Sequence, residues 1–201
     1  MEIEPSAVKN VLLLLLRDFS STHTVTSLAQ ELGVTRVGAW KILKRLESTQ
    51  FLNLRPIGAG KTSTFLVTLN WDNLLVEKSL SLYLTEEALL HKRWRSNFVE
   101  LEEAADFLIL FGSILHSPNE AHDIDIIGVV SQRKGFIRIQ QILDKIQKTQ
   151  SKKIHSINFT SLEFKQELLK PNKVFIEAIK KGIILFGQEN FIKFMSQVHQ
   201  K

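Results

Sequence analysis

The chain has 201 residues, long enough for one large domain or two small ones, and its 44% hydrophobic and 23% charged residues are ordinary for a globular protein. It has no cysteine, which excludes a disulfide framework and thiolate metal sites. Its net charge of +5 admits an anionic partner but does not require one.

Charge is unevenly distributed along the chain. Residues 1–70 carry eight Lys/Arg against five Asp/Glu, residues 71–105 four against seven, and residues 106–201 fourteen against nine. Any nucleic acid partner would therefore meet one of the two ends rather than the middle. The most apolar run, Val11 to Leu16, is too short to span a bilayer, and the acidic start argues against a signal peptide. These features predict a cytoplasmic protein with no membrane partner.

Helical signals fill the first fifty residues. Apolar positions from Val8 to Phe19 predict a buried helix. A short second helix is expected to be capped by the side-chain oxygen of Thr26 or Ser27 and to end at Gly33. Thr35 can cap a third helix. The inner face of that helix is predicted to consist of Val37, Ile42, Leu43 and Leu46.

The third helix has a basic outer face, formed by Arg36, Lys41, Lys44 and Arg45. Two alternating apolar runs follow, around a Gly-Ala-Gly-Lys turn that contains Lys61, and they predict a β-hairpin. This order resembles a winged helix-turn-helix, which lays its second motif helix in the major groove and brings its wing to the phosphates. The resemblance implies that these five basic residues bind double-stranded DNA, and a palindromic site would suit a homodimer. Such a domain can instead serve only for protein contacts.

Residues 71–105 predict two packed connector helices, capped by Asp72 and Thr85, without a Gly or Pro to interrupt them. The chain then enters "DFLILFGS", an apolar strand that ends in Gly112 and Ser113. A second strand, "DIDIIGVV", places Asp123 and Asp125 on the same sheet face. Two carboxylates this close repel each other, and Mg²⁺ or Mn²⁺ would compensate their charge. Gly112 would let phosphates approach the backbone, and Ser113 offers them a hydroxyl.

Gly-Ser, nine residues and then Asp-x-Asp between strands resembles the DNA polymerase beta-type nucleotidyltransferase superfamily, especially its minimal prokaryotic members. The final segment, "NKVFIEAIKKGIILFGQENFIKF", is similar to that family's closing helix, strand and helix, so the resemblance covers about residues 95–201. Fusion to an N-terminal winged helix also looks like an architecture among archaeal members.

The resemblance implies that Asp123 and Asp125 hold two Mg²⁺ ions and that Gly112 and Ser113 grip the triphosphate of an NTP. The family's third carboxylate lies on the next strand, where the matching position holds Asn158, an uncharged residue that cannot act as a base. His155 could substitute as the base.

We therefore expect an α+β protein with a winged helix-turn-helix over residues 1–70, connector helices over 71–105 and a nucleotidyltransferase-like domain over 106–201. The second domain should hold a small mixed sheet with helices on one side. The predicted activity is metal-dependent transfer of NMP from NTP to an unknown acceptor, with Asp123, Asp125 and Asn158 at the catalytic centre. The alternative is a DNA-binding transcriptional regulator whose transferase domain is inactive, and a third reading has the aspartates merely capping a turn.

Overall fold

A computed structural model describes residues 5–58, 64–170 and 172–199. The chain divides into two compact units, Met1–Tyr83 and Leu84–Lys201. Helices and two separate β-sheets make up the structure, which confirms the α+β class. Within the described ranges, no helix is both long and apolar enough to cross a membrane.

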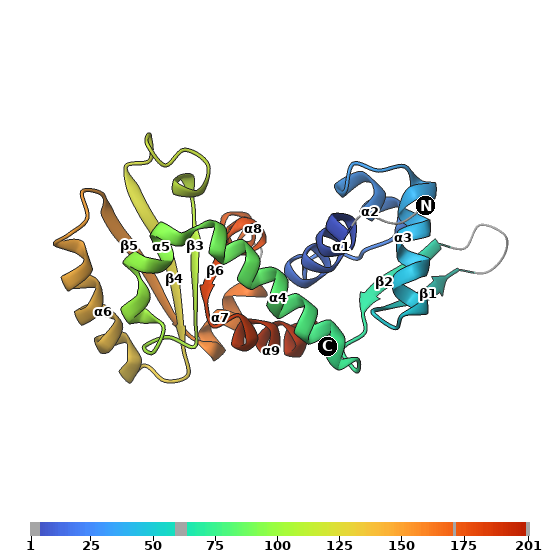
Figure 1. Ribbon diagram of the computed structural model, residues 1–201. Helices are drawn as coiled ribbons and strands as arrows, with labels where there is room; N and C mark the ends of the chain where they lie inside the picture. Colours follow the sequence, from blue (N-terminus) through green and yellow to red (C-terminus); the bar gives the residue numbers. More distant parts are fainter. Residues whose placement is uncertain (1–4, 59–63, 171, 200–201) are drawn as a thin grey trace. The chain divides into compact units, whose positions relative to one another are not determined.

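The first unit consists of three helices followed by a two-stranded antiparallel hairpin (Figure 1). Its elements are α1 (Pro5–Arg17), α2 (Val25–Glu31), α3 (Arg36–Ser48), β1 (Leu52–Ile57) and β2 (Thr64–Leu69). The predicted helices and strands are therefore present in the predicted order. A bridge between Thr24 and Leu66 ties the start of α2 to β2.

The helix ends in this unit follow capping rules, with one correction. The cap of α2 is Thr24 rather than Thr26 or Ser27, because Ser27 sits at the third helical position and forms a reciprocal capping box with Thr24. Gly33 has φ +65°, the left-handed conformation expected after a helix end. Thr35 caps α3 as predicted, since its hydroxyl oxygen accepts the Gly38 N–H at 3.1 Å.

The buried face of α3 differs from the prediction at one position. Val37 is 65% exposed, whereas the residues that face the core are Ala39, Ile42, Leu43 and Leu46. Those four residues follow the i, i+3, i+4, i+7 spacing of a single helix stripe, and Val37 lies outside it. The outer face of α3 therefore carries an apolar residue among its basic ones.

The prediction that Thr85 caps a second connector helix is wrong. A single helix, α4 (Leu74–Leu90), runs through that residue, and the boundary between the two units falls within it. The start of α4 is capped by Asn73 instead of Asp72, because the Asn73 side-chain oxygen accepts the Leu75 N–H at 3.0 Å. The short helices α5 (Lys92–Asn97) and η1 (Val99–Leu101) follow.

The second unit is built on a four-stranded mixed sheet. Its strands are β3 (Phe107–Phe111), β4 (Asp123–Val130), β5 (Lys153–Thr160) and β6 (Ile183–Phe186), and they lie in the order β5-β4-β3-β6, seen from left to right in Figure 1. β4 and β5 are parallel, whereas β3 runs antiparallel to both β4 and β6. The mixed sheet was predicted.

Helices cover both faces of this sheet, not one as expected. α6 (Lys134–Gln147), α5 and η1 pack on the face of Leu108 and Ile126. The opposite face presents Phe107, whose ring packs against Phe164 of α7 (Ser161–Leu168) and Phe191 of α9 (Gln188–His199). α8 (Lys173–Lys181) adds Phe175 to that aromatic cluster. Because β3 and most of β4 are apolar at consecutive residues, both of their faces need a cover.

Candidate metal centre and basic helix

The two aspartates lie where β3 ends and β4 begins. Asp123 and Asp125 alternate with buried Ile124, so both carboxylates project from one face of the sheet. Phe111 is the strand partner of Asp125, and Gly112 therefore leaves β3 beside it. On the other side, parallel pairing sets His155 of β5 next to Asp125. Three separate segments of the chain thus meet at one end of the sheet.

These three polar side chains form a compact group. Nδ1 of His155 lies 3.3 Å from Oδ2 of Asp123 and 3.6 Å from Oδ1 of Asp125. One ligand atom from each residue lies within 4.8 Å of the others. The side chains are 46%, 35% and 26% exposed for His155, Asp123 and Asp125 respectively. The group is therefore held by rigid strands and remains open to a ligand.

Partial burial and a neighbouring charge both alter the titration of Asp125. Partial burial raises the pKa of its carboxyl above the ordinary value, and the neighbouring Asp123 charge acts in the same direction. The contact with His155 acts against both. A bound divalent cation would favour the ionised form of both carboxylates. Two carboxylates and one imidazole are a donor set that fits such a cation.

Gly112 is required by the geometry of this site. Its φ is +85°, and a Cβ added there would lie 2.5 Å from Oδ2 of Asp125. A side chain would therefore both strain the backbone and collide with the carboxylate. Ser113 follows it at the start of the short turn η2 (Ser113–Leu115) and is exposed.

Asn158 is not brought to the aspartate pair. It pairs with Gly128, three residues beyond Asp125, and its side chain lies on the opposite face of the sheet, near Ile139 of α6. A Cβ added to Gly128 would lie 2.6 Å from the Asn158 Oδ1 atom, which accepts a hydrogen bond from the Ser156 hydroxyl at 3.1 Å. The residue of β5 that meets the aspartates is His155.

A second group of potential ligands, which no sequence pattern predicted, lies in the first unit. Asp18, His23 and Glu31 approach one another around the turn between α1 and α2. His23 is only 5% exposed, and its Nε2 lies 2.9 Å from the Asp18 carbonyl oxygen. Its Nδ1 lies 3.9 Å from the Glu31 carboxylate and has no hydrogen-bond partner within the described part of the chain.

Four of the predicted DNA-contacting residues lie on α3. Arg36, Lys41, Lys44 and Arg45 are all exposed. Lys44 forms an ion pair with Glu47 and lies 5.6 Å from the Trp40 ring centre. Lys61 lies outside the described residues. Beside the basic side chains is a small apolar hollow, lined by Val25, Arg36, Val37, Trp40 and Phe65.

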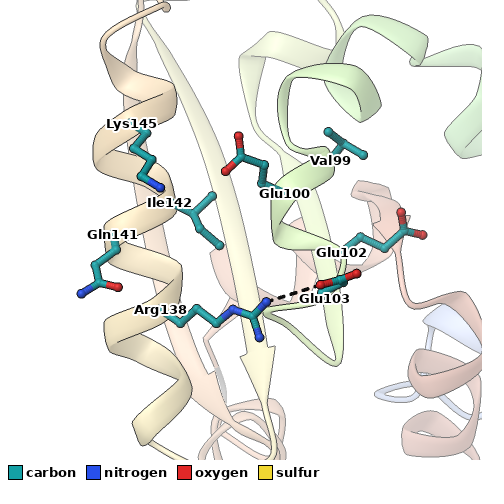
Figure 2. Close-up of a pocket in the computed structure, with 8 residues that line it drawn as sticks. All are labelled: Val99, Glu100, Glu102, Glu103, Arg138, Gln141, Ile142 and Lys145. Atoms are coloured by element: carbon teal, nitrogen blue, oxygen red, sulfur yellow. Dashed lines mark hydrogen bonds and ion pairs between the residues drawn. The ribbon is translucent and has the colours of Figure 1, made fainter.

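A larger cleft of about 600 Å³ lies between η1 and α6 (Figure 2). Glu100, Glu102 and Glu103 line it on one side, and Arg138 and Lys145 on the other. Arg138 and Glu103 approach to 3.5 Å. This cleft borders the α6 face of the sheet, opposite the aspartates, and its three carboxylates make it a poor site for a triphosphate.

No protein-family model and no curated protein matches the chain. The functional inference therefore depends on the geometry of four residues, Asp123, Asp125, His155 and Gly112.

Proposed function

We propose that the second unit is a metal-dependent nucleotidyltransferase of the DNA polymerase beta-like type, which transfers NMP from an NTP to a hydroxyl acceptor. The observation that carries this proposal is the meeting of Asp123 and Asp125 with the side-chain-free backbone of Gly112 at one end of the sheet. Carboxylates paired on one strand suit a divalent cation, Mg²⁺ or Mn²⁺, and a bare backbone suits phosphate oxygens.

The proposed reaction is an in-line displacement at the α-phosphorus. The acceptor oxygen forms a bond to that phosphorus, the bond to the bridging oxygen breaks, pyrophosphate leaves, and the hydroxyl proton passes to solvent or to a nearby base. When bound, a divalent cation would neutralise negative charge that develops during the transfer. Asp123 and Asp125 would hold the cation, while the Gly112 backbone and the Ser113 hydroxyl would orient the triphosphate.

We further propose that the first unit is a winged helix-turn-helix that binds double-stranded DNA. Support comes from the exposed basic residues of α3 and from the antiparallel hairpin that follows it. Exposed Val37, on the same helix surface, would suit contact with a thymine methyl group. Basic residues would provide affinity through phosphates, and base contacts would provide selectivity.

A second candidate is a DNA-binding regulator whose transferase domain is catalytically inactive. The observation that favours it is the position of His155, since no carboxylate from the described residues of β5 meets Asp123 and Asp125. A missing acidic group would weaken proton removal from the acceptor. In this candidate the second unit keeps its fold without activity, and the first unit performs the function by binding DNA.

Label transfer from α-phosphate-labelled NTPs separates the two candidates. The wild-type protein and the Asp123→Asn/Asp125→Asn variant are incubated with Mg²⁺ or Mn²⁺, in the presence and absence of added RNA. The transferase proposal predicts labelled protein or RNA with the wild type and none with the variant. Equal label with both proteins would contradict the assigned site. Absence of label together with retained binding to duplex DNA would favour the regulator.

A further inference from the structure

We propose that His155 is a metal ligand and that the Asp123–Asp125–His155 group selects a first-row transition ion, with Mn²⁺ as its representative, over Mg²⁺. This inference rests on the metal site of the proposed function but not on transfer activity. It narrows the choice of cation, which the two carboxylates alone leave open between Mg²⁺ and Mn²⁺.

The placement of His155 supports a role as a ligand. Nδ1 lies between the two carboxylates, 3.3 Å from Oδ2 of Asp123 and 3.6 Å from Oδ1 of Asp125. Strand register fixes this placement, because Asp125 and His155 are paired residues of the parallel strands β4 and β5. The imidazole therefore offers its nitrogen at the same point as the carboxylate oxygens.

The donor set then decides the type of ion. Mg²⁺ binds almost entirely through oxygen, keeps several water ligands and demands near-ideal octahedral geometry. An imidazole nitrogen instead favours first-row transition ions, whose affinity for a nitrogen and oxygen site rises along the series from Mn²⁺. Mn²⁺ also accepts carboxylate and phosphate oxygens, so it fits both the protein ligands and a triphosphate. A histidine in place of a third carboxylate also leaves the site less negative. This weakens the binding of Mg²⁺ in particular, because proteins hold that ion through carboxylate and phosphate oxygens.

The position of His155 has a second explanation, which the experiment must distinguish from metal binding. Protonated His155 could act as a fixed cation that neutralises the two aspartates, with no metal involved. In that arrangement Nδ1 carries a proton toward the carboxylates and its lone pair is not available to a metal ion. Direct observation of nitrogen on a bound ion distinguishes the two cases.

Mn²⁺ binding is measured by electron paramagnetic resonance on the whole chain without nucleotide, and Mg²⁺ is added as a competitor. We expect Mn²⁺ to be preferred by about tenfold or more, since the loss of even a hydrogen-bond partner of a metal ligand changes metal affinity on that scale. Pulsed measurements should show ¹⁴N coupling from a coordinated imidazole. His155→Asp should reduce the preference for Mn²⁺ and abolish that coupling, whereas His91→Asp, outside the group, should change neither.

Three carboxylates in one place can destabilise the fold, so His155→Gln, which adds no charge, is measured beside His155→Asp. It should also lose the nitrogen coupling. Bound Mn²⁺ without nitrogen coupling, equal affinity for Mg²⁺ and Mn²⁺, or no metal binding at all would overturn the inference. Mn²⁺ binding with nitrogen coupling but without label transfer would sustain the inference and contradict the proposed transferase. Label transfer by a protein that prefers Mg²⁺ would support the proposed transferase and overturn the inference about the metal.

Discussion

Gly112 and Asp125 stand so close that no side chain fits between them, since an added Cβ would lie 2.5 Å from the carboxylate. Gly112→Ala should therefore displace Asp125 and weaken Mn²⁺ binding markedly, besides costing about 1–3 kcal/mol of unfolding free energy, because the backbone at φ +85° and ψ −165° is in a region that essentially only glycine adopts. Titration with Mn²⁺ and denaturant unfolding measure the two effects.

Gly33→Ala is the matched control for that change. Gly33 also has a positive φ, but a Cβ added there meets no described atom within 4 Å. It should lower the unfolding free energy by a similar amount and leave Mn²⁺ binding intact. Equal Mn²⁺ affinity in the two variants would show that the close approach to Asp125 is unimportant for the site.

We expect Asn158 to stabilise the fold and to have no role in metal binding. Asn158→Ala removes the acceptor of the Ser156 hydroxyl and should lower the unfolding free energy by about 1 kcal/mol, with Mn²⁺ affinity unchanged. Asn158→Asp should likewise fail to raise transfer activity, because the new carboxylate would lie on the α6 face of the sheet. A gain of activity in Asn158→Asp would instead support its place at the catalytic centre.

The basic surface of α3 predicts a salt-dependent interaction with duplex DNA. Lys41→Ala and Arg45→Ala should each weaken binding across unrelated sequences and reduce the slope of log affinity against log salt by about 1. Fluorescence anisotropy at several salt concentrations measures that slope. Lys148→Ala, an exposed lysine after α6, is the control and should leave the slope unchanged.

The start of α7 should give a measurable dependence of stability on pH. Glu163 accepts the Thr160 N–H at 2.8 Å and the Thr160 hydroxyl at 2.9 Å, and it pairs with Arg133; these contacts, the backbone one foremost, lower its pKa to about 2. Because the pKa is lower in the folded state, the stabilisation is fully present above the ordinary glutamate pKa and is lost as pH falls toward about 2.

Glu163→Gln tests that assignment, because glutamine can keep the capping hydrogen bond but does not titrate. The unfolding free energy of the variant should fall less steeply than that of the wild type as pH decreases through this acidic range. Denaturant unfolding at successive pH values measures the two slopes, and parallel slopes would count against the role of Glu163.

Local patterns predicted much of the fold. Thr35 and Gly33 mark helix ends through side-chain capping and backbone conformation, which depend on nearby residues only. The Asp123–Asp125 pair likewise shares a face because strand alternation is local. The register between β4 and β5 depends on distant residues, and it decides that His155 rather than Asn158 meets the aspartates. Helices on both sheet faces also depend on long-range packing.

The most direct test of the central claim is metal-dependent nucleotide binding, because it needs no knowledge of the acceptor. Equilibrium dialysis with a labelled NTP is run with Mn²⁺ or with EDTA, for the wild type and for Asp123→Asn/Asp125→Asn. We predict that the wild type binds the NTP with Mn²⁺, loses it with EDTA, and that the variant does not bind it under either condition. Binding that survives EDTA or the double substitution would contradict a nucleotide site built on these two aspartates.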